Sequence, residues 1–321
     1  MRLAFAFACV LTAGCYSPGY RDCEVTCTTG ACPSGLSCEQ GYCRVPGETA
    51  SCSSVLADAG NDTMADAGNP FGTPVALTND ISVRDHDPSM TDNMLELYTS
   101  RQGAATEDIW RYARNQASSP FGTAAAETVS TQTQNEEGVD VSGDGTVMFF
   151  IRDGASQRDI NMSTRPVGAP WSNGTPIPEL DPGDNSANPS LSRDGLMIVF
   201  ERLDETQYSL WQSTRTSAQS QWMPPQPIMS LPISGGLKPQ SPMLSADKLT
   251  IYFHARGTSG SNDIFEAHRA TVTASFGAPV PVDGVNTANE QEEDPWISAD
   301  GKTIVFVRTQ GNGTLIFTAA R

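Results

Sequence analysis

Short runs in which hydrophobic and polar positions alternate fill residues 71–321. In one of them Ile304 and Phe306 alternate with Thr303 and Val305, the period of two that is typical of a β-strand. Neighbouring positions are also apolar, which indicates a strand buried on both faces. Comparable runs end at Thr99, Phe150, Phe200, Phe253 and Phe306. Since no segment after the N-terminus keeps a helical period, we expect almost no helix.

A turn signal of the form Ser-x-Asp-Gly precedes each of these strands. Its third position is occupied by Asn93, Asp144, Asp194, Asp247 and Asp300, which are spaced 50 to 53 residues apart. Met94 and Lys248 replace the glycine in two copies. Asp and Ser side chains can accept backbone N–H groups in a tight turn, and Gly permits a positive φ. We therefore assign these residues a structural role in turns rather than a catalytic one.

Two further signals recur at the same period. One is a strand that opens near Asp-Ile-aromatic and closes on an arginine, at Arg114, Arg165, Arg215, Arg269 and Arg321. We expect these arginines to pair with acids between repeats. The other is an aromatic-Gly-x-Pro signal that opens a fourth strand, at Phe71, Phe121, Trp171, Trp222 and Phe276. The fourth-strand signal comes first in the chain, whereas the chain ends on a third strand.

Four strands in each of five units of about 50 residues predict an all-β fold, a five-bladed β-propeller that spans residues 71–321. The offset of the signals predicts that the strand near Phe71 completes the blade whose other strands come from residues 288–321. Such closure removes open sheet edges and ties the two ends of the domain together.

These boxes resemble the WD40-like repeats of TolB-type β-propellers from bacterial envelopes. The resemblance covers residues 71–321. It implies the propeller fold, but propellers of this kind serve as scaffolds, binders and lids, so it does not specify a function. Asn93, Met94, Asn161 and Lys248 depart from the family pattern, which suggests that the blades have diverged unequally.

The first 14 residues predict an export signal. One positive charge at Arg2 precedes an apolar run that ends near Leu11, and small residues precede Cys15. The segment resembles a bacterial lipoprotein signal, which implies that Cys15 is lipidated and becomes the mature N-terminus. Thr12 stands where that family prefers Leu, so an ordinary secretory signal is the alternative. The residue after Cys15 is Tyr16, which is compatible with an outer-membrane lipoprotein of the cell envelope.

Residues 15–52 carry the lipid anchor and a cysteine-rich module. Six cysteines lie close together, at Cys23, Cys27, Cys32, Cys38, Cys43 and Cys52. In an exported chain this density predicts disulfides, whose connectivity stays open. We expect no metal and no cofactor, because the three histidines of the chain lie far from these cysteines. Residues 53–70, rich in small and acidic side chains, predict a flexible linker.

The charge of the chain limits its partners. The 37 acidic residues outnumber the 20 basic ones and give a net charge of -17, which disfavours nucleic acid as a ligand. We expect a monomer that is held at the membrane by its lipid anchor. Its partner would be an envelope protein, a peptide or a glycan.

Candidate catalytic residues lie where the inner strands approach the propeller axis. Asp87, Glu137, Glu293 and Asp294 come just before the turn-proximal part of these strands, so their carboxyl groups are expected near one mouth of the central channel. Five-bladed propellers include glycoside hydrolases that use a pair of carboxyl groups. No spacing among these residues identifies an acid and a base. We therefore predict a non-catalytic binding or scaffolding module, with a glycoside hydrolase or lyase acting on extracellular polysaccharide as the alternative.

Overall fold

A computed structural model describes residues 25–26, 37–39, 42–44 and 70–321, apart from residues 104, 132, 154–157, 182–184, 205–206, 229–237 and 257–259. The signal segment, Cys15, the linker and the cysteine side chains lie outside the described residues, and the predictions made for them stay predictions. Near the N-terminus, β1 (Val25–Thr26), β3 (Tyr42–Arg44) and β2 (Ser37–Glu39) pair in that order as an antiparallel sheet.

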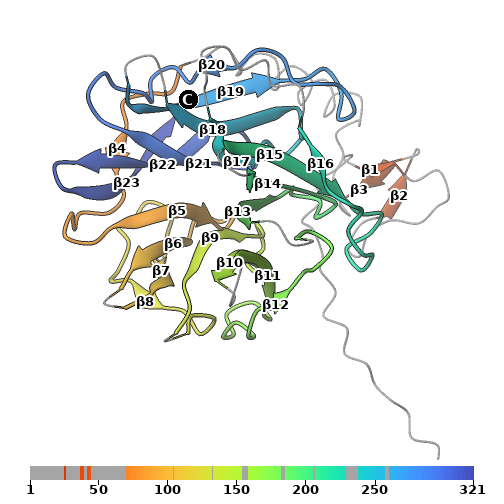
Figure 1. Cartoon of the computed structure of the whole chain (residues 1–321), viewed down its shortest axis with the longest axis horizontal. Helices are drawn as coiled ribbons and strands as arrows, with labels where there is room; N and C mark the ends of the chain where they lie inside the picture. Colours follow the sequence, from red (N-terminus) through yellow and green to blue (C-terminus); the bar gives the residue numbers. More distant parts are fainter. Residues whose placement is uncertain are drawn as a thin grey trace, which may run out of the picture.

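The five-bladed propeller is confirmed, as five four-stranded antiparallel sheets that surround a common axis (Figure 1). The innermost strands are β5 (Asp85–Met90), β9 (Glu136–Val141), β13 (Asn185–Leu191), β17 (Gln240–Leu244) and β21 (Glu292–Ile297). The second strands are β6 (Glu96–Gln102), β10 (Val147–Asp153), β14 (Met197–Asp204), β18 (Thr250–Arg256) and β22 (Thr303–Gln310). The third strands are β7 (Glu107–Ala113), β11 (Arg158–Thr164), β15 (Gln207–Thr214), β19 (Asn262–His268) and β23 (Gly313–Ala320).

The outermost strands are only two residues long. They are β8 (Ala125–Ala126), β12 (Thr175–Pro176), β16 (Gln226–Pro227), β20 (Val280–Pro281) and β4 (Val75–Ala76). Three of them contain proline, which cannot donate a ladder hydrogen bond. Short outer strands with proline limit edge-to-edge association of the blades.

The predicted closure of the ring is also confirmed. Strand β4 pairs with β23, with Ala76 opposite Phe317 and Val75 opposite Thr318. The main-chain N–H of Leu77 also donates to the carbonyl of Ile316 at 2.7 Å. The last blade is therefore built from both ends of the domain.

The core lies between the blades. The aromatic residues within the second strands of blades 2 to 5 are completely buried, and they pack in apolar clusters with side chains of the preceding blade, at Phe150, Phe200, Phe253 and Phe306. Among the described residues no helix is long and apolar enough to cross a bilayer.

The turn boxes are held by hydrogen bonds within each turn. In four boxes the serine Oγ donates to the aspartate Oδ1 at 2.6 Å, for Asp144, Asp194, Asp247 and Asp300. In the first box Thr91 donates to Asn93 at 2.8 Å. Met94 and Lys248, which replace glycine, adopt φ values of 60° and 63°. The turn thus imposes the left-handed conformation even where the residue does not favour it.

The five repeated arginines have a common environment that differs from the predicted one. Each guanidinium lies 4.3 to 4.5 Å from the centre of the aromatic ring that opens the fourth strand. Each Nε donates to a carbonyl oxygen at the end of the turn box, at 2.7 to 3.0 Å. The predicted contact with an acid is made by Arg165, to Glu96 at 2.5 Å. The interactions shared by all five are this hydrogen bond and cation–π stacking within the blade.

Candidate functional site

Every inner strand carries a β-bulge at the same place. In β5 the pairing with β6 shifts between His86 and Ser89, and the extra residue Asp87 has a φ of 49°. The equivalent residues of the other blades also have positive φ, at Gly138, Asn188, Ser241 and Asp294. Bulges redirect side chains, and a non-glycine residue in this conformation stores strain. We call these five residues the axial ring.

Hydrogen bonds link the axial ring around the channel. Asp87 accepts the N–H of Gly138 at 3.0 Å and donates its own N–H to Asp294 at 3.3 Å. Ser241 donates its hydroxyl to Asp294 at 2.7 Å and accepts from the Asn188 amide at 2.8 Å. A Cβ at Gly138 would lie 2.8 Å from Oδ1 of Asn188, so a side chain at this position would require Asn188 to move. The structure therefore brings together two of the four candidate carboxylates, Asp87 and Asp294.

Two buried residues that the sequence analysis missed complete this cluster. Glu201 accepts the N–H of Ser241 at 3.1 Å, and Nδ1 of His254 lies 3.4 Å from Oδ1 of Asp294. Both side chains come from second strands and are 3% and 6% exposed. They occupy equivalent register positions, opposite Ala187 and Gln240. A polar residue within an otherwise apolar second strand was the signal that could have identified them.

The surroundings of the three carboxyl groups push their pKa values apart. Burial raises the pKa of Asp87 to about 7, and the nearby charge of Asp294 adds to this effect. Burial likewise raises the pKa of Glu201 to about 7. Burial alone would raise the pKa of Asp294 as well, but the hydrogen bond and charge of His254 lower it to about 2. At neutral pH the site thus combines an ionised carboxylate with carboxyl groups that retain protons.

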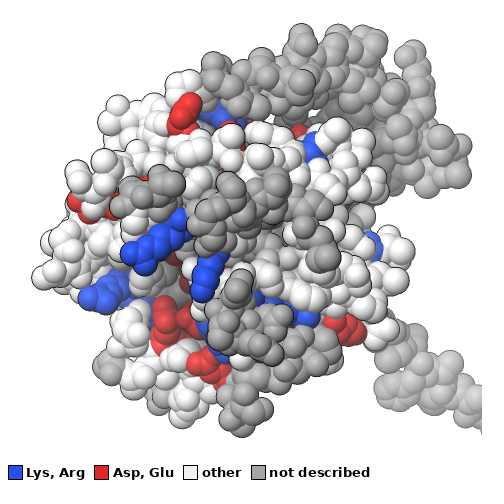
Figure 2. All heavy atoms as spheres, turned by 45° about the horizontal axis from the view of Figure 1, so that its top comes forward, with Lys and Arg blue, Asp and Glu red and all other residues white. Residues whose placement is uncertain are grey.

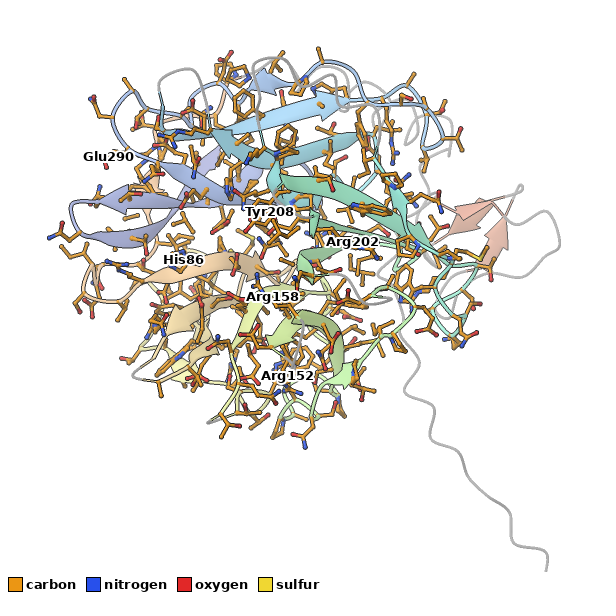
Figure 3. All side chains as sticks on the ribbon, viewed as in Figure 1. His86, Arg152, Arg158, Arg202, Tyr208 and Glu290 are labelled. Atoms are coloured by element: carbon orange, nitrogen blue, oxygen red, sulfur yellow. The ribbon has the colours of Figure 1, made fainter. Side chains whose placement is uncertain are left out.

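The other two candidate carboxylates lie beside the ring and have other partners. Glu137 forms an ion pair with Arg158. Glu293 accepts a hydrogen bond from the Asn262 amide at 2.5 Å. Figure 3 shows Arg158 and His86 near the centre of the disc, on neighbouring blades. Glu137 and Glu293 therefore belong to the rim of the channel mouth.

The channel beneath the ring is narrow and is blocked at its far end. A cavity of about 40 Å³ is lined by the ring residues and the residues that follow them. Arg193, from blade 3, bonds to Asp92 of blade 1 at 2.7 Å and to the carbonyl of Ile297 of blade 5 at 3.2 Å. A side chain that joins these three blades must cross the axis. The cavity has room for water molecules rather than for a sugar ring, so a larger ligand would approach from the rim.

The described residues include no group of three or more His, Cys, Asp or Glu side chains placed to hold a metal ion. The chemistry that this site offers is proton transfer between carboxyl groups and water.

Comparison with known proteins gives a likeness of fold. No protein-family model and no curated protein matches the chain. An endo-arabinase from Bacteroides thetaiotaomicron is similar with a TM-score of 0.58 and 14% identity, over 79% of this chain and 98% of that one. The catalytic domain of a GH62 α-L-arabinofuranosidase from Coprinopsis cinerea is similar with a TM-score of 0.54 and 10% identity, over 78% of this chain and 96% of that one. TolB from Acinetobacter baumannii has a TM-score of 0.46 and 12% identity, over 76% of this chain and 56% of that one.

These findings overturn the prediction of a non-catalytic binding or scaffolding module. The solved structures that share this architecture over nearly their whole length include glycoside hydrolases. The axial carboxyl groups also hold protons with different affinity, which a purely structural disc does not require. The alternative prediction, a glycoside hydrolase or lyase, is the better supported of the two.

Proposed function

We propose that this protein is a glycoside hydrolase that acts on polysaccharide outside the cell. The observation that carries the proposal is the pair Asp87 and Asp294, which lie together on the propeller axis with pKa values of about 7 and about 2. Glycoside hydrolysis needs one carboxyl group that is protonated and one that is ionised. The endo-arabinase and the α-L-arabinofuranosidase of similar fold support this choice of chemistry.

Asp87 is the general acid in this proposal. It is partly exposed at the ring, whereas Asp294 is 8% exposed. Its raised pKa keeps a proton available near neutral pH for the oxygen of the leaving sugar. As the C–O bond of the glycoside breaks, that proton passes to the departing oxygen.

Asp294 is the ionised partner. His254 and Ser241 hold it by hydrogen bonds, which fix its orientation and stabilise its negative charge. It accepts the proton of the attacking water, whose oxygen bonds to the anomeric carbon. The axial cavity can hold that water. The Glu201 carboxyl group positions Ser241 by accepting a hydrogen bond from the main-chain N–H of Ser241.

The test is hydrolysis of arabinan, arabinoxylan and other plant and bacterial polysaccharides, followed by the release of reducing ends. We expect Asp87→Asn and Asp294→Asn to lower kcat by about 10² to 10⁴-fold, since each removes a proton-transfer group. Asp283→Asn is the control, because that side chain is exposed and lies outside the axial ring. Equal rates in all four proteins, or no hydrolysis of any glycan by the wild type, would refute the proposal.

We also propose that the propeller is tethered in the cell envelope by lipidation of Cys15, and that its blades derive from TolB-type repeats. The apolar run before Cys15 and the recurring turn boxes support these two statements. We expect Cys15→Ser to release the protein from membranes into the soluble fraction, with its hydrolytic rate unchanged. Fractionation of cells after metabolic labelling with a fatty acid measures this. An unlabelled wild-type protein would mean that the signal is an ordinary secretory one.

A further inference from the structure

A buried ion pair recurs where the first and second strands of a blade meet at the rim. The pairs are Arg101 with Asp85 at 2.7 Å, Arg152 with Glu136 at 2.8 Å, and Arg308 with Glu292 at 2.8 Å. The carboxylates are 0 to 1% exposed. In blade 3 the equivalent Arg202 is also buried and donates to the carbonyl of Leu180 at 2.8 Å. In these four blades the arginine has a structural role.

Blade 4 lacks both members of the pair. In β18, Ala255 occupies the position that the arginine has in the other blades. Pro239, two residues before the bulge residue Ser241, occupies the position of the acid. Ala255 is 1% exposed, so its methyl group fills the position that the arginine side chain fills in the other blades. The arginine of this blade is the next residue, Arg256, which ends β18 and is exposed. Arg256 therefore does not make the buried contact that the arginines of the other four blades make.

Acidic residues flank the groove lining in the chain, since Asp263 follows Asn262, and Glu290, Glu292 and Glu293 stand beside Gln291. In the part of the chain that the structure describes, no acidic group forms an ion pair with Arg256. Glu292 pairs with Arg308 at 2.8 Å, and Glu293 accepts a hydrogen bond from Asn262 at 2.5 Å. Figure 2 shows basic and acidic side chains interspersed on one face rather than a uniformly acidic surface. Two of these carboxylates thus already have partners, and Arg256 is an exposed guanidinium with which an anion can pair.

Arg256 lies in a polar groove between blades 4 and 5. The groove has a volume of about 620 Å³ and is lined by Arg256, Gly260, Ser261, Asn262, Ala288, Asn289 and Gln291. This volume is in the range of about 300 to 1,000 Å³ that small-molecule sites occupy. Amide and hydroxyl groups of the lining can donate to and accept from sugar hydroxyls. None of the described residues that line the groove carries a carboxyl group, although Glu290 lies between Asn289 and Gln291 in the chain.

The groove adjoins the axial ring. Asn262, which pairs with Arg256 across the end of the β18–β19 hairpin, donates to Glu293 at 2.5 Å. Glu293 immediately precedes Asp294 in β21. A sugar held in the groove would therefore place the adjoining sugar of the same chain toward the axial carboxyl groups.

We propose that this groove is a subsite for a uronic acid residue, with Arg256 binding its carboxylate, so that the substrate is an acidic polysaccharide. The inference rests on the proposed glycoside hydrolase function and specifies its substrate class. A guanidinium forms two parallel hydrogen bonds with a planar carboxylate, which gives both charge and geometric selectivity. The amides of the lining bind the hydroxyl groups of the same sugar.

The test measures binding by calorimetry, independently of hydrolysis. The ligands are oligogalacturonides, their methyl esters and neutral arabino-oligosaccharides of equal length. We expect the wild type to bind oligogalacturonides at least about tenfold more tightly than the methyl esters, and Arg256→Gln to lose this preference. Arg84→Gln is the control, because Arg84 is an exposed arginine outside the groove, so its loss changes the net charge equally. The melting temperature of each variant confirms that it is folded.

The outcomes separate this inference from the proposed function. Uronate binding that depends on Arg256, without cleavage of any glycan, would retain the subsite and refute the hydrolase. If the protein cleaves neutral arabinan but binds oligogalacturonides and their methyl esters equally well, the hydrolase proposal stands and the uronate subsite is refuted. Sulfated oligosaccharides test the other source of a sugar anion. If they bind through Arg256 and oligogalacturonides do not, the assignment to a carboxylate is wrong.

Discussion

Single side chains decide the chemistry at the axis. Asp87 and Asp294 are the same residue type at equivalent bulges, yet Nδ1 of His254 lies 3.4 Å from the carboxylate of Asp294, and its hydrogen bond and charge keep that carboxylate ionised. The negative charge of Asp294 then adds to the effect of burial on Asp87. Two chemically identical residues are thus assigned opposite proton states by one histidine.

These shifts predict a pH dependence of stability. Asp87 and Glu201 have folded-state pKa values of about 7, above the usual carboxyl range, so the folded state binds protons more tightly than the unfolded state. Their contribution to stability is therefore present at about pH 4 and is lost as the pH rises toward 7. We expect the free energy of unfolding to fall by a few kcal/mol, in order of magnitude, over this window.

Denaturant titrations at several pH values measure this loss. In Asp87→Asn the decline should be visibly shallower, because one of the carboxyl groups with a raised pKa, which also include Glu201 and Asp140, no longer titrates. Asp283→Asn, at an exposed position, should retain the wild-type slope. A wild-type stability that rises steadily from pH 4 to pH 7 would contradict the raised pKa values.

At the scale of the element, each blade is stabilised by the same three contacts. The box serine bonds the box aspartate, the arginine Nε bonds a carbonyl at the end of the box, and the guanidinium stacks on the aromatic ring of the fourth strand. The arginine thus connects the turn between the first two strands to the outer edge of the sheet. This explains why the chain repeats an arginine and an aromatic residue at a fixed distance.

The stacking predicts the effect of removing one arginine. In blade 3, Arg215 lies 4.3 Å from the ring centre of Trp222 and donates to Gly195 at 2.7 Å. We expect Arg215→Ala to lower the free energy of unfolding by about 1 to 3 kcal/mol, from the lost cation–π contact and hydrogen bond. Arg84→Ala, at an exposed arginine that stacks on none of these rings, should cost well under 1 kcal/mol. Equal effects would show that the stacking contributes nothing.

At the scale of the whole molecule, closure of the ring holds the site together. Asp87 and Asp294 lie in the first and last blades, and the two blades are neighbours because β4 pairs with β23. The N–H of Gly72 donates to the carbonyl of Ala320 at 2.8 Å, and Thr78 accepts the N–H of Ile316 at 3.0 Å. Loss of this pairing would open the last blade and would also separate the proposed acid from its partner.

Deletion of residues 71–80 tests this dependence. We expect the shortened protein to lose the cooperative unfolding transition of the wild type or to melt at a much lower temperature, because a sheet edge and apolar surface become exposed. A matched deletion of residues 53–69, which lie before the first residue of the propeller, should leave the melting temperature unchanged. Retention of the full melting temperature by the first variant would refute the role of closure.

The sequence by itself determined the architecture of this protein. Turn boxes such as Ser192 to Gly195, the buried strand aromatics and the offset of the fourth-strand signal are local patterns, and five copies in register predict both the number of blades and the closure. Asp87 and Asp294 could be proposed for the axis because the same repeat places them at equivalent positions of the inner strands.

Only the tertiary structure decided the composition of the site. Glu201 and His254 occur in strands that read as apolar core, and they reach the axis because a bulge in the neighbouring blade directs a main-chain N–H toward them. Likewise, Glu137 and Glu293 have the expected positions along the strands, but nearby side chains bind them at the rim. Hydrogen bonds between blades join residues far apart in the chain, and the proton affinity of a carboxyl group depends on burial and on those neighbours.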